Sequence, residues 1–104
     1  MAYQTGDSKY NILRKLVEKE GGAPLPGDLS YLLLRKYLVI IGGTPRTGDL
    51  FNKLLARVVL VKGGTPLPGD DEWNLLSRWL QAAGSAPSPG DSLHNLWRKI
   101  LALP

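Results

Sequence analysis

Charged residues recur at fixed places in this chain, and they are the first candidates for chemistry. An aspartate follows a glycine at five sites spaced 21 residues apart, and a lysine or arginine stands eight residues after each aspartate. Clustered carboxylates can bind metal ions, and clustered cations can bind phosphates or other anions. The aspartates are Asp7, Asp28, Asp49, Asp70 and Asp91, and the cations are Lys15, Lys36, Arg57, Arg78 and Lys99.

The spacing of these residues argues against metal binding and catalysis. A calcium loop needs closely spaced oxygen ligands ending in glutamate, and the sequence has no such run. The single histidine, His94, has no cysteine or second histidine with which to complete a zinc site, and no serine stands in a nucleophile elbow. The Gly-Gly-Thr-Pro segments do not match a phosphate-binding loop. We expect no enzymatic activity, no cofactor and no metal, and His94 to be an ordinary surface or packing residue.

The cations are the stronger candidates for binding. If symmetry relates the five units, the cations form a ring at one level, extended by Arg14, Arg35 and Arg98, that could hold an anion, nucleic acid or an acidic protein. In the alternative interpretation, each cation bonds an aspartate cap, a glutamate or a linker carbonyl of a neighbouring repeat. We favour this alternative, and we do not favour nucleic acid as the partner.

The same spacing defines the element that carries the charges. If the glycine of each Gly-Asp is position one, positions seven, eight, eleven and twelve are apolar in all five units, which indicates an amphipathic helix. Aspartate at position two is a favoured N-cap, and glycine at position sixteen with proline at nineteen is typical of a helix end. We predict helices over 8–20, 29–41, 50–62, 71–83 and 92–103, with N-caps at Asp7, Asp28, Asp49, Asp70 and Asp91.

The third helix conflicts with local propensity. The β-branched run from Val58 to Val61 favours a strand by composition. The repeat register favours a helix, because the same positions of other units carry Glu, Lys, Gln and Ala.

The linkers determine how the helices can be arranged. A helix of about 13 residues is about 20 Å long, and the residues that connect it to the next can span about 26 Å. Each linker can therefore return alongside its helix, so that successive helices are parallel. The chain is one residue short of five periods and its terminal units resemble the others, which favours a closed ring over an open solenoid with polar end repeats.

The expected fold is all-α. Five single-helix repeats form a compact closed pseudo-fivefold ring, and an open α-solenoid is the alternative. We expect one repeat domain, 1–104, with units 6–26, 27–47, 48–68, 69–89 and 90–104, the last completed by 1–5.

Position five lies at the edge of the apolar stripe opposite the cation. Its occupants are Tyr10, Tyr31, Asn52, Trp73 and His94. In a cyclic arrangement the basic edge of one helix faces the aromatic edge of the next, and we expect cation–π contacts there.

Composition limits the classes of protein that fit. The 104 residues, 43% of them hydrophobic, suit one small domain, and the net charge of +4 is mild. No cysteine is present, and nothing at the N-terminus resembles a signal peptide. The most apolar run, 32–41, contains Arg35 and Lys36 and is shorter than the roughly 20 residues of a membrane span. We expect a soluble protein.

The repeat resembles a known kind of sequence. Units reading Gly-Gly-Thr-Pro-x-Pro-Gly-Asp-x-x-x-Asn-Leu-Leu-x-Lys-Ile-Leu, best seen here over 63–80 and 89–101, are similar to short tandem repeats encoded by tailed, especially marine, bacteriophages, often in virion or tail-fibre-associated proteins. The resemblance covers the whole chain and implies a phage-encoded structural or interaction module, located in the virion or the host cytoplasm.

Two functions remain open. The first is a structural or assembly module, a spacer or adaptor that offers its outer surface to a larger assembly and is monomeric if the ring closes. The second is a binding module whose basic and aromatic edges hold an anionic ligand, nucleic acid or an acidic protein. The candidate surface is Arg14, Lys15, Arg35, Lys36, Arg57, Arg78, Arg98 and Lys99.

Overall fold

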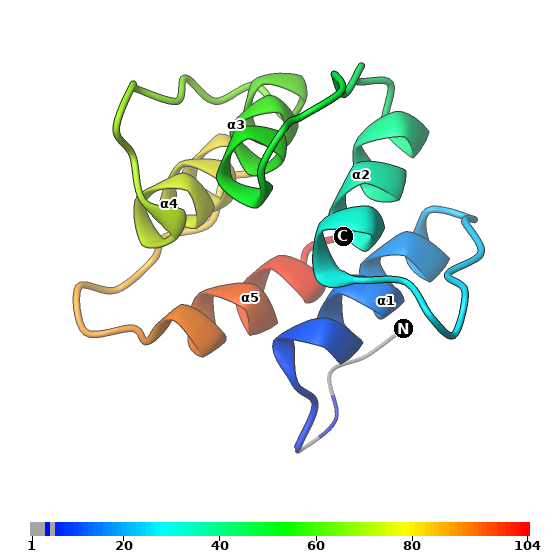
Figure 1. The fold of residues 1–104 in the computed structure, drawn as a ribbon. Helices are drawn as coiled ribbons and strands as arrows, with labels where there is room; N and C mark the ends of the chain where they lie inside the picture. The colour runs from blue at the N-terminus through cyan, green and yellow to red at the C-terminus, as the bar shows by residue number, and fades with distance from the viewer. Residues whose placement is uncertain (1–3, 5) are drawn as a thin grey trace.

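Five helices make up the fold, as the repeat predicted. The structure, a computed structural model, describes residues 4 and 6–104, and over this part of the chain it contains five α-helices and no strand (Figure 1). The predicted ranges differ from these bounds only by including the capping residues, and one residue more after the last helix. The helices are α1 Lys9–Lys19, α2 Ser30–Ile40, α3 Phe51–Val61, α4 Glu72–Ala82 and α5 Leu93–Leu101.

The repeat register correctly outweighed local propensity at α3. Its β-branched run is helical because Val58 and Val59 occupy core positions of the repeat, where burial against the neighbouring helices decides the conformation.

The core consists of the four apolar positions of every unit. Positions seven, eight, eleven and twelve are buried in all five helices, and these twenty residues form a single cluster. The largest of them meet each other: the ring of Trp79 lies 5.7 Å from that of Tyr37 and 6.4 Å from that of Trp97, centroid to centroid. Burial of this apolar surface is the main force that holds the helices together.

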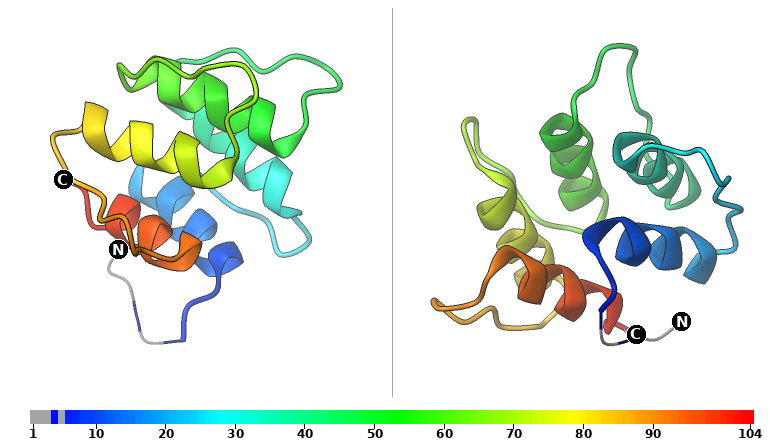
Figure 2. Two further views of the ribbon diagram at one scale, coloured as in Figure 1. Left: turned by 90° about the vertical axis from the view of Figure 1, so that its left-hand side faces the viewer. Right: turned by 60° about the horizontal axis from the view of Figure 1, so that its bottom comes forward.

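Helices far apart in the sequence lie side by side. Each helix packs against the next one along the chain, and α5 also packs against α1 (Figure 2). Lys19 of α1 donates from Nζ to the carbonyl of Leu101 at 3.3 Å and also to that of Leu103. The body measures 34 × 33 × 20 Å, so it is flattened along one direction. The expected completion of the fifth unit by residues 1–5 falls almost entirely outside the described residues.

The helices end as predicted. In the linker after α2, Gly42 adopts φ +100°, a left-handed conformation that disfavours other residues, and the N–H of Gly43 donates to the Leu38 carbonyl at 2.8 Å. A Cβ on Gly43 would lie 2.2 Å from Leu38 Cδ1, so a larger residue there would require the Leu38 side chain to move.

The helices do not begin as predicted. The N-cap is the residue after each aspartate, so the prediction of N-caps at Asp7, Asp28, Asp49, Asp70 and Asp91 is wrong. Side chains cap three helices: Ser8 accepts the N–H of Asn11 at 3.2 Å, Asp71 that of Asn74 at 2.8 Å, and Ser92 that of Asn95 at 3.1 Å. In α2 and α3 the caps are leucines, which make no such bond. The five N-caps are Ser8, Leu29, Leu50, Asp71 and Ser92.

Candidate functional site

Each aspartate at position two closes the linker that precedes its helix. In the third unit, Asp49 Oδ2 accepts the N–H of Arg46 at 2.9 Å, and the N–H of Asp49 donates to the Arg46 carbonyl at 3.1 Å. The other four aspartates accept the same linker N–H at 2.8–2.9 Å. This turn directs the carboxylate toward the linker, which is why it does not cap the helix.

The same carboxylates bind the cations at position ten. The Asp49 carboxylate accepts from Arg57 Nε at 2.7 Å and from Nη2 at 3.3 Å, and the Arg78–Asp70 pair has the same two-point geometry. The lysine pairs join Nζ to Oδ2 at 2.5 Å. Each cation is therefore bonded to the aspartate of its own unit, whereas we had expected bonds to a neighbouring unit. The five pairs are Asp7–Lys15, Asp28–Lys36, Asp49–Arg57, Asp70–Arg78 and Asp91–Lys99.

These contacts alter the acidity of the aspartates. The hydrogen bond from the cation, followed by that from the linker N–H, holds the pKa of each position-two carboxyl below its ordinary value. The charge of each cation is thus matched within its own unit. Five of the eight residues of the predicted binding surface, Lys15, Lys36, Arg57, Arg78 and Lys99, are thus paired with aspartates.

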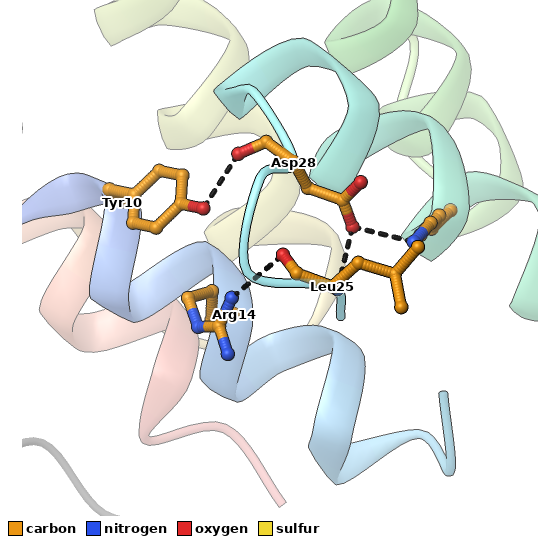
Figure 3. A network of polar contacts seen from close by, with 5 residues as sticks. Tyr10, Arg14, Leu25 and Asp28 are labelled. Atoms are coloured by element: carbon orange, nitrogen blue, oxygen red, sulfur yellow. Dashed lines mark hydrogen bonds and ion pairs between the residues drawn. The ribbon is translucent and has the colours of Figure 1, made fainter. Parts of the chain in front are cut away.

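The arginines at position nine differ in what they contact. Arg14 donates from Nη1 to the Leu25 carbonyl of the following linker at 3.1 Å, and its guanidinium lies 5.9 Å from the Tyr10 ring of the same helix (Figure 3). Arg35 is half-buried and lines a shallow pocket beside α2, while Arg98 is exposed on α5. Arg14 therefore holds the linker of its own unit against α1, whereas Arg35 and Arg98 each line a hollow.

Two of the three aromatic residues at position five, Tyr10 and Trp73, form hydrogen bonds to the next unit. Tyr10 donates from its hydroxyl to the Asp28 carbonyl at 2.6 Å (Figure 3), and Trp73 donates from Nε1 to the Asp91 carbonyl at 2.9 Å. We had expected cation–π contact with the basic edge of the neighbouring helix. The Arg14–Tyr10 contact instead lies within α1, and the polar atoms of the two rings bind the backbone of the next unit.

A charged cluster that sequence reasoning missed joins four helices. Lys9 of α1 lies 3.1 Å from Glu72 of α4, and its Nζ lies 4.1 Å from the centroid of the Phe51 ring of α3. Glu72 also accepts the indole N–H of Trp97 of α5 at 2.8 Å. The sequence feature that could have indicated this cluster is the residue at position four, which is charged only in the first and fourth units, at Lys9 and Glu72.

A small pocket lies where the helices end. It has a volume of about 280 Å³, and residues of all five units line it, among them Leu16, Tyr37, Lys62, Trp79 and Leu103. Burial raises the pKa of the Tyr37 hydroxyl above its ordinary value, and Lys62 Nζ lies 5.5 Å from the centroid of the Tyr37 ring. The pocket is smaller than the usual range for ligand sites of about 300 to 1,000 Å³.

Neither a metal-ligand set nor a membrane-spanning helix occurs in the described part of the chain. Over residues 4 and 6–104, no three histidine, aspartate or glutamate side chains gather as a metal-ligand set. Within the same range no helix has both the length and the apolar character needed to cross a bilayer.

Comparison with known proteins adds no relative to these observations. No protein-family model matches the chain, and neither curated proteins nor solved structures match it.

Proposed function

We propose that this protein is a non-enzymatic structural or assembly module, a compact helical-repeat adaptor or spacer. The observation that carries the proposal is the use of the recurrent charged residues. In every unit the aspartate binds both the cation and the linker N–H, as Asp49 binds Arg57 and Arg46, so the shared role of these residues is to build the unit. Residues that recur for this purpose serve the architecture, and a partner would be recognised by residues that differ between units.

The architecture we propose is a closed ring of five units with pseudo-fivefold symmetry. The packing of α5 against α1, the flattened body and the pocket lined by all five units support closure. A ring has no exposed end repeat, so each helix buries its apolar face on both sides. We also expect the closed ring to be a monomer, since closure leaves no end surface to pair.

Spin-label distances test the closure. Position thirteen is exposed at Glu18, Gln81 and Ala102, and cysteines there carry labels without touching the core. In a closed ring, the distances between labels at Glu18 and Ala102 have the same narrow distribution as those between labels at Gln81 and Ala102, on the order of 10 to 20 Å. The Glu18–Gln81 pair gives a longer one. A Glu18–Ala102 distance longer than the Glu18–Gln81 distance would mean an open solenoid.

Particle composition tests the assembly role. The resemblance to phage repeats makes a virion the assembly we propose. Mass spectrometry of purified particles from the encoding phage should then find this chain in a fixed ratio to the other structural proteins. Detection only in the soluble fraction of infected host cells would contradict a structural role in the particle.

A second candidate function is the binding of an anionic ligand. The observation that favours it is a group of cations on and after α2 and α3 that form no ion pair with a described residue: Arg35, Arg46, Lys53 and Lys62. Binding of labelled single-stranded and duplex nucleic acid, measured over a salt series, tests it, because each phosphate contact steepens the salt dependence. No binding at about 20 mM salt would eliminate nucleic acid as the ligand.

A further inference from the structure

The second and third units differ from the others where the helices face solvent. Position three is Leu29 and Leu50 in these units, but serine or aspartate in the other three. Position thirteen is Val39 and Leu60, against glutamate, glutamine and alanine elsewhere. All four side chains are exposed, from 55% at Val39 to 79% at Leu50. Since the other units have the same helix with polar or small residues here, the fold does not require these apolar side chains.

The apolar residues at position three replace a stabilising contact. Leu29 and Leu50 are the two N-caps without a side-chain hydrogen bond, whereas Ser8 and Ser92 make it. An exposed leucine that gives up a helix cap gains little from burial, since Leu29 is 59% and Leu50 79% exposed. A binding role accounts for its presence.

The apolar positions share one side of each helix. At 100° per residue, positions three, thirteen and fourteen fall within about a third of the helix circumference. Ile40 and Val61 at position fourteen are also exposed, at 38% and 42%. We refer to the α2–α3 apolar surface as Leu29, Val39, Ile40, Leu50, Leu60 and Val61.

Two hollows lie beside this surface. One of about 480 Å³ lies between α2 and the preceding linker, lined by Leu32, Arg35 and Val39 among others. The other, of about 400 Å³, lies between α3 and the following linker, lined by Lys53, Leu60 and neighbouring residues. Each hollow offers apolar side chains beside a cation. Such hollows fit side chains that project from a partner better than a flat lipid surface.

The net positive charge of the protein is concentrated in the same region. The second and third units, residues 27–68, contain six lysines and arginines and two acidic residues, a net charge of +4. The rest of the chain contains seven lysines and arginines and seven acidic residues, a net charge of zero. The α2–α3 apolar surface is therefore flanked by uncompensated cations. Two copies paired through this surface would bring like charges together, which disfavours a second copy as the occupant.

We propose that the α2–α3 apolar surface binds an acidic amphipathic segment of a partner protein. Apolar side chains of the segment enter the two hollows, and its carboxylates face Arg35 and Lys53. The inference rests on the assembly role proposed above and names the surface and the class of partner through which it would act.

A labelled peptide tests the surface with the full chain. The probe is an amphipathic peptide of about 18 residues, long enough to form a helix on binding, with leucines on one face and glutamates on the other. A second peptide has the glutamates replaced by lysines. Fluorescence anisotropy should show binding of the acidic peptide and not of the basic one, with amide NMR shifts confined to α2, α3 and their linkers. No binding at low salt, or equal binding of both peptides, would overturn the proposal.

The repeat supplies variants that keep the fold. Leu29→Ser and Leu50→Ser introduce the residue that caps α1 and α5, so together they should preserve the fold while weakening peptide binding by about ten-fold. Lys53→Asn introduces the residue found at the same position in three other units and should reduce both affinity and its salt dependence. The matched control is Leu93→Ser on α5, an exposed leucine outside the surface, which should leave binding unchanged. Unchanged binding by the double leucine variant would contradict the assignment.

The other occupants have distinct readouts. Dimerisation in sedimentation experiments that Leu50→Ser abolishes would identify a second copy, and binding to anionic vesicles but not to the peptide would identify a membrane. Either result overturns the proposed partner. Failure of this proposal is separable from failure of the assembly role, because particle composition tests the role without reference to the peptide.

Discussion

Glu72 accepts the indole N–H of Trp97 at 2.8 Å across the interface between α4 and α5. Trp97 is buried at position eight, where the other four units have leucine. A buried indole needs an acceptor for its N–H, and leucine does not. Glu72 is the only glutamate at position four. The unit with tryptophan in place of leucine therefore lies beside the unit that supplies the acceptor for its N–H.

Removing the acceptor should destabilise the protein. Glu72→Leu leaves the Trp97 N–H without its partner and is expected to lower the free energy of unfolding by about 1 to 3 kcal/mol in urea titrations. Glu72→Gln keeps an acceptor oxygen and should cost less. In a double-mutant cycle with Trp97→Phe, the two losses should be less than additive, and full additivity would mean that the hydrogen bond contributes nothing.

Stability should fall at acidic pH. The pKa of each position-two carboxyl is lower in the folded protein than in the unfolded chain, so the unfolded chain binds protons first and the ion pairs stabilise the fold at neutral pH. Thermal midpoints should be nearly constant above about pH 5 and decline as the pH falls through and below the ordinary carboxyl pKa of about 4.

The ion pair of the third unit can be tested separately. Asp49→Asn keeps an oxygen that can accept the Arg46 N–H but loses the charge that binds Arg57, so it should be less stable than the parent protein at pH 7. The difference in melting temperature between the Asp49→Asn variant and the parent protein should become smaller toward pH 2. A constant difference over this range would show that the ion pair is not its source.

A side-chain N-cap should stabilise α2 and α3, which lack one. Leu50→Ser provides α3 with the side-chain acceptor that Ser8 and Ser92 provide in α1 and α5, and it should raise the free energy of unfolding by about 1 kcal/mol. Ser92→Ala should lower it by a similar amount. A destabilised Leu50→Ser protein would show that the exposed leucine contributes to the fold.

Glycine at position one should matter in some units and not in others. Gly48 has φ +89°, a conformation that strains an alanine, so Gly48→Ala should cost about 1 to 2 kcal/mol. Gly27, at the same repeat position, has no positive φ and open space around its Cα, so Gly27→Ala should be neutral or stabilising by up to about 1 kcal/mol. Chemical denaturation of the two variants under one condition provides the comparison, and equal losses would contradict it.

The recurrent residues near the candidate site could be found from the sequence, but their contacts could not. Asp49 and Arg57 were identified by their spacing, yet the cation was expected to bond a neighbouring unit, because spacing does not say which carboxylate lies within reach. The α2–α3 apolar surface was visible in principle as leucines at positions that are polar elsewhere. It went unrecognised because exposure can be judged only once the packing of the helices is known.

The sequence by itself determined the number of helices, their C-terminal ends and the core. Apolar spacing, left-handed glycines and proline act within a single turn or linker, so the buried positions of a unit, such as Leu54 and Leu55, could be read without any neighbour. Only the tertiary structure decided what the charges do. Whether Asp49 caps its helix or closes its linker depends on the path of the linker, and whether Lys9 meets Glu72 depends on which helices converge. These contacts join groups that the local sequence does not bring together.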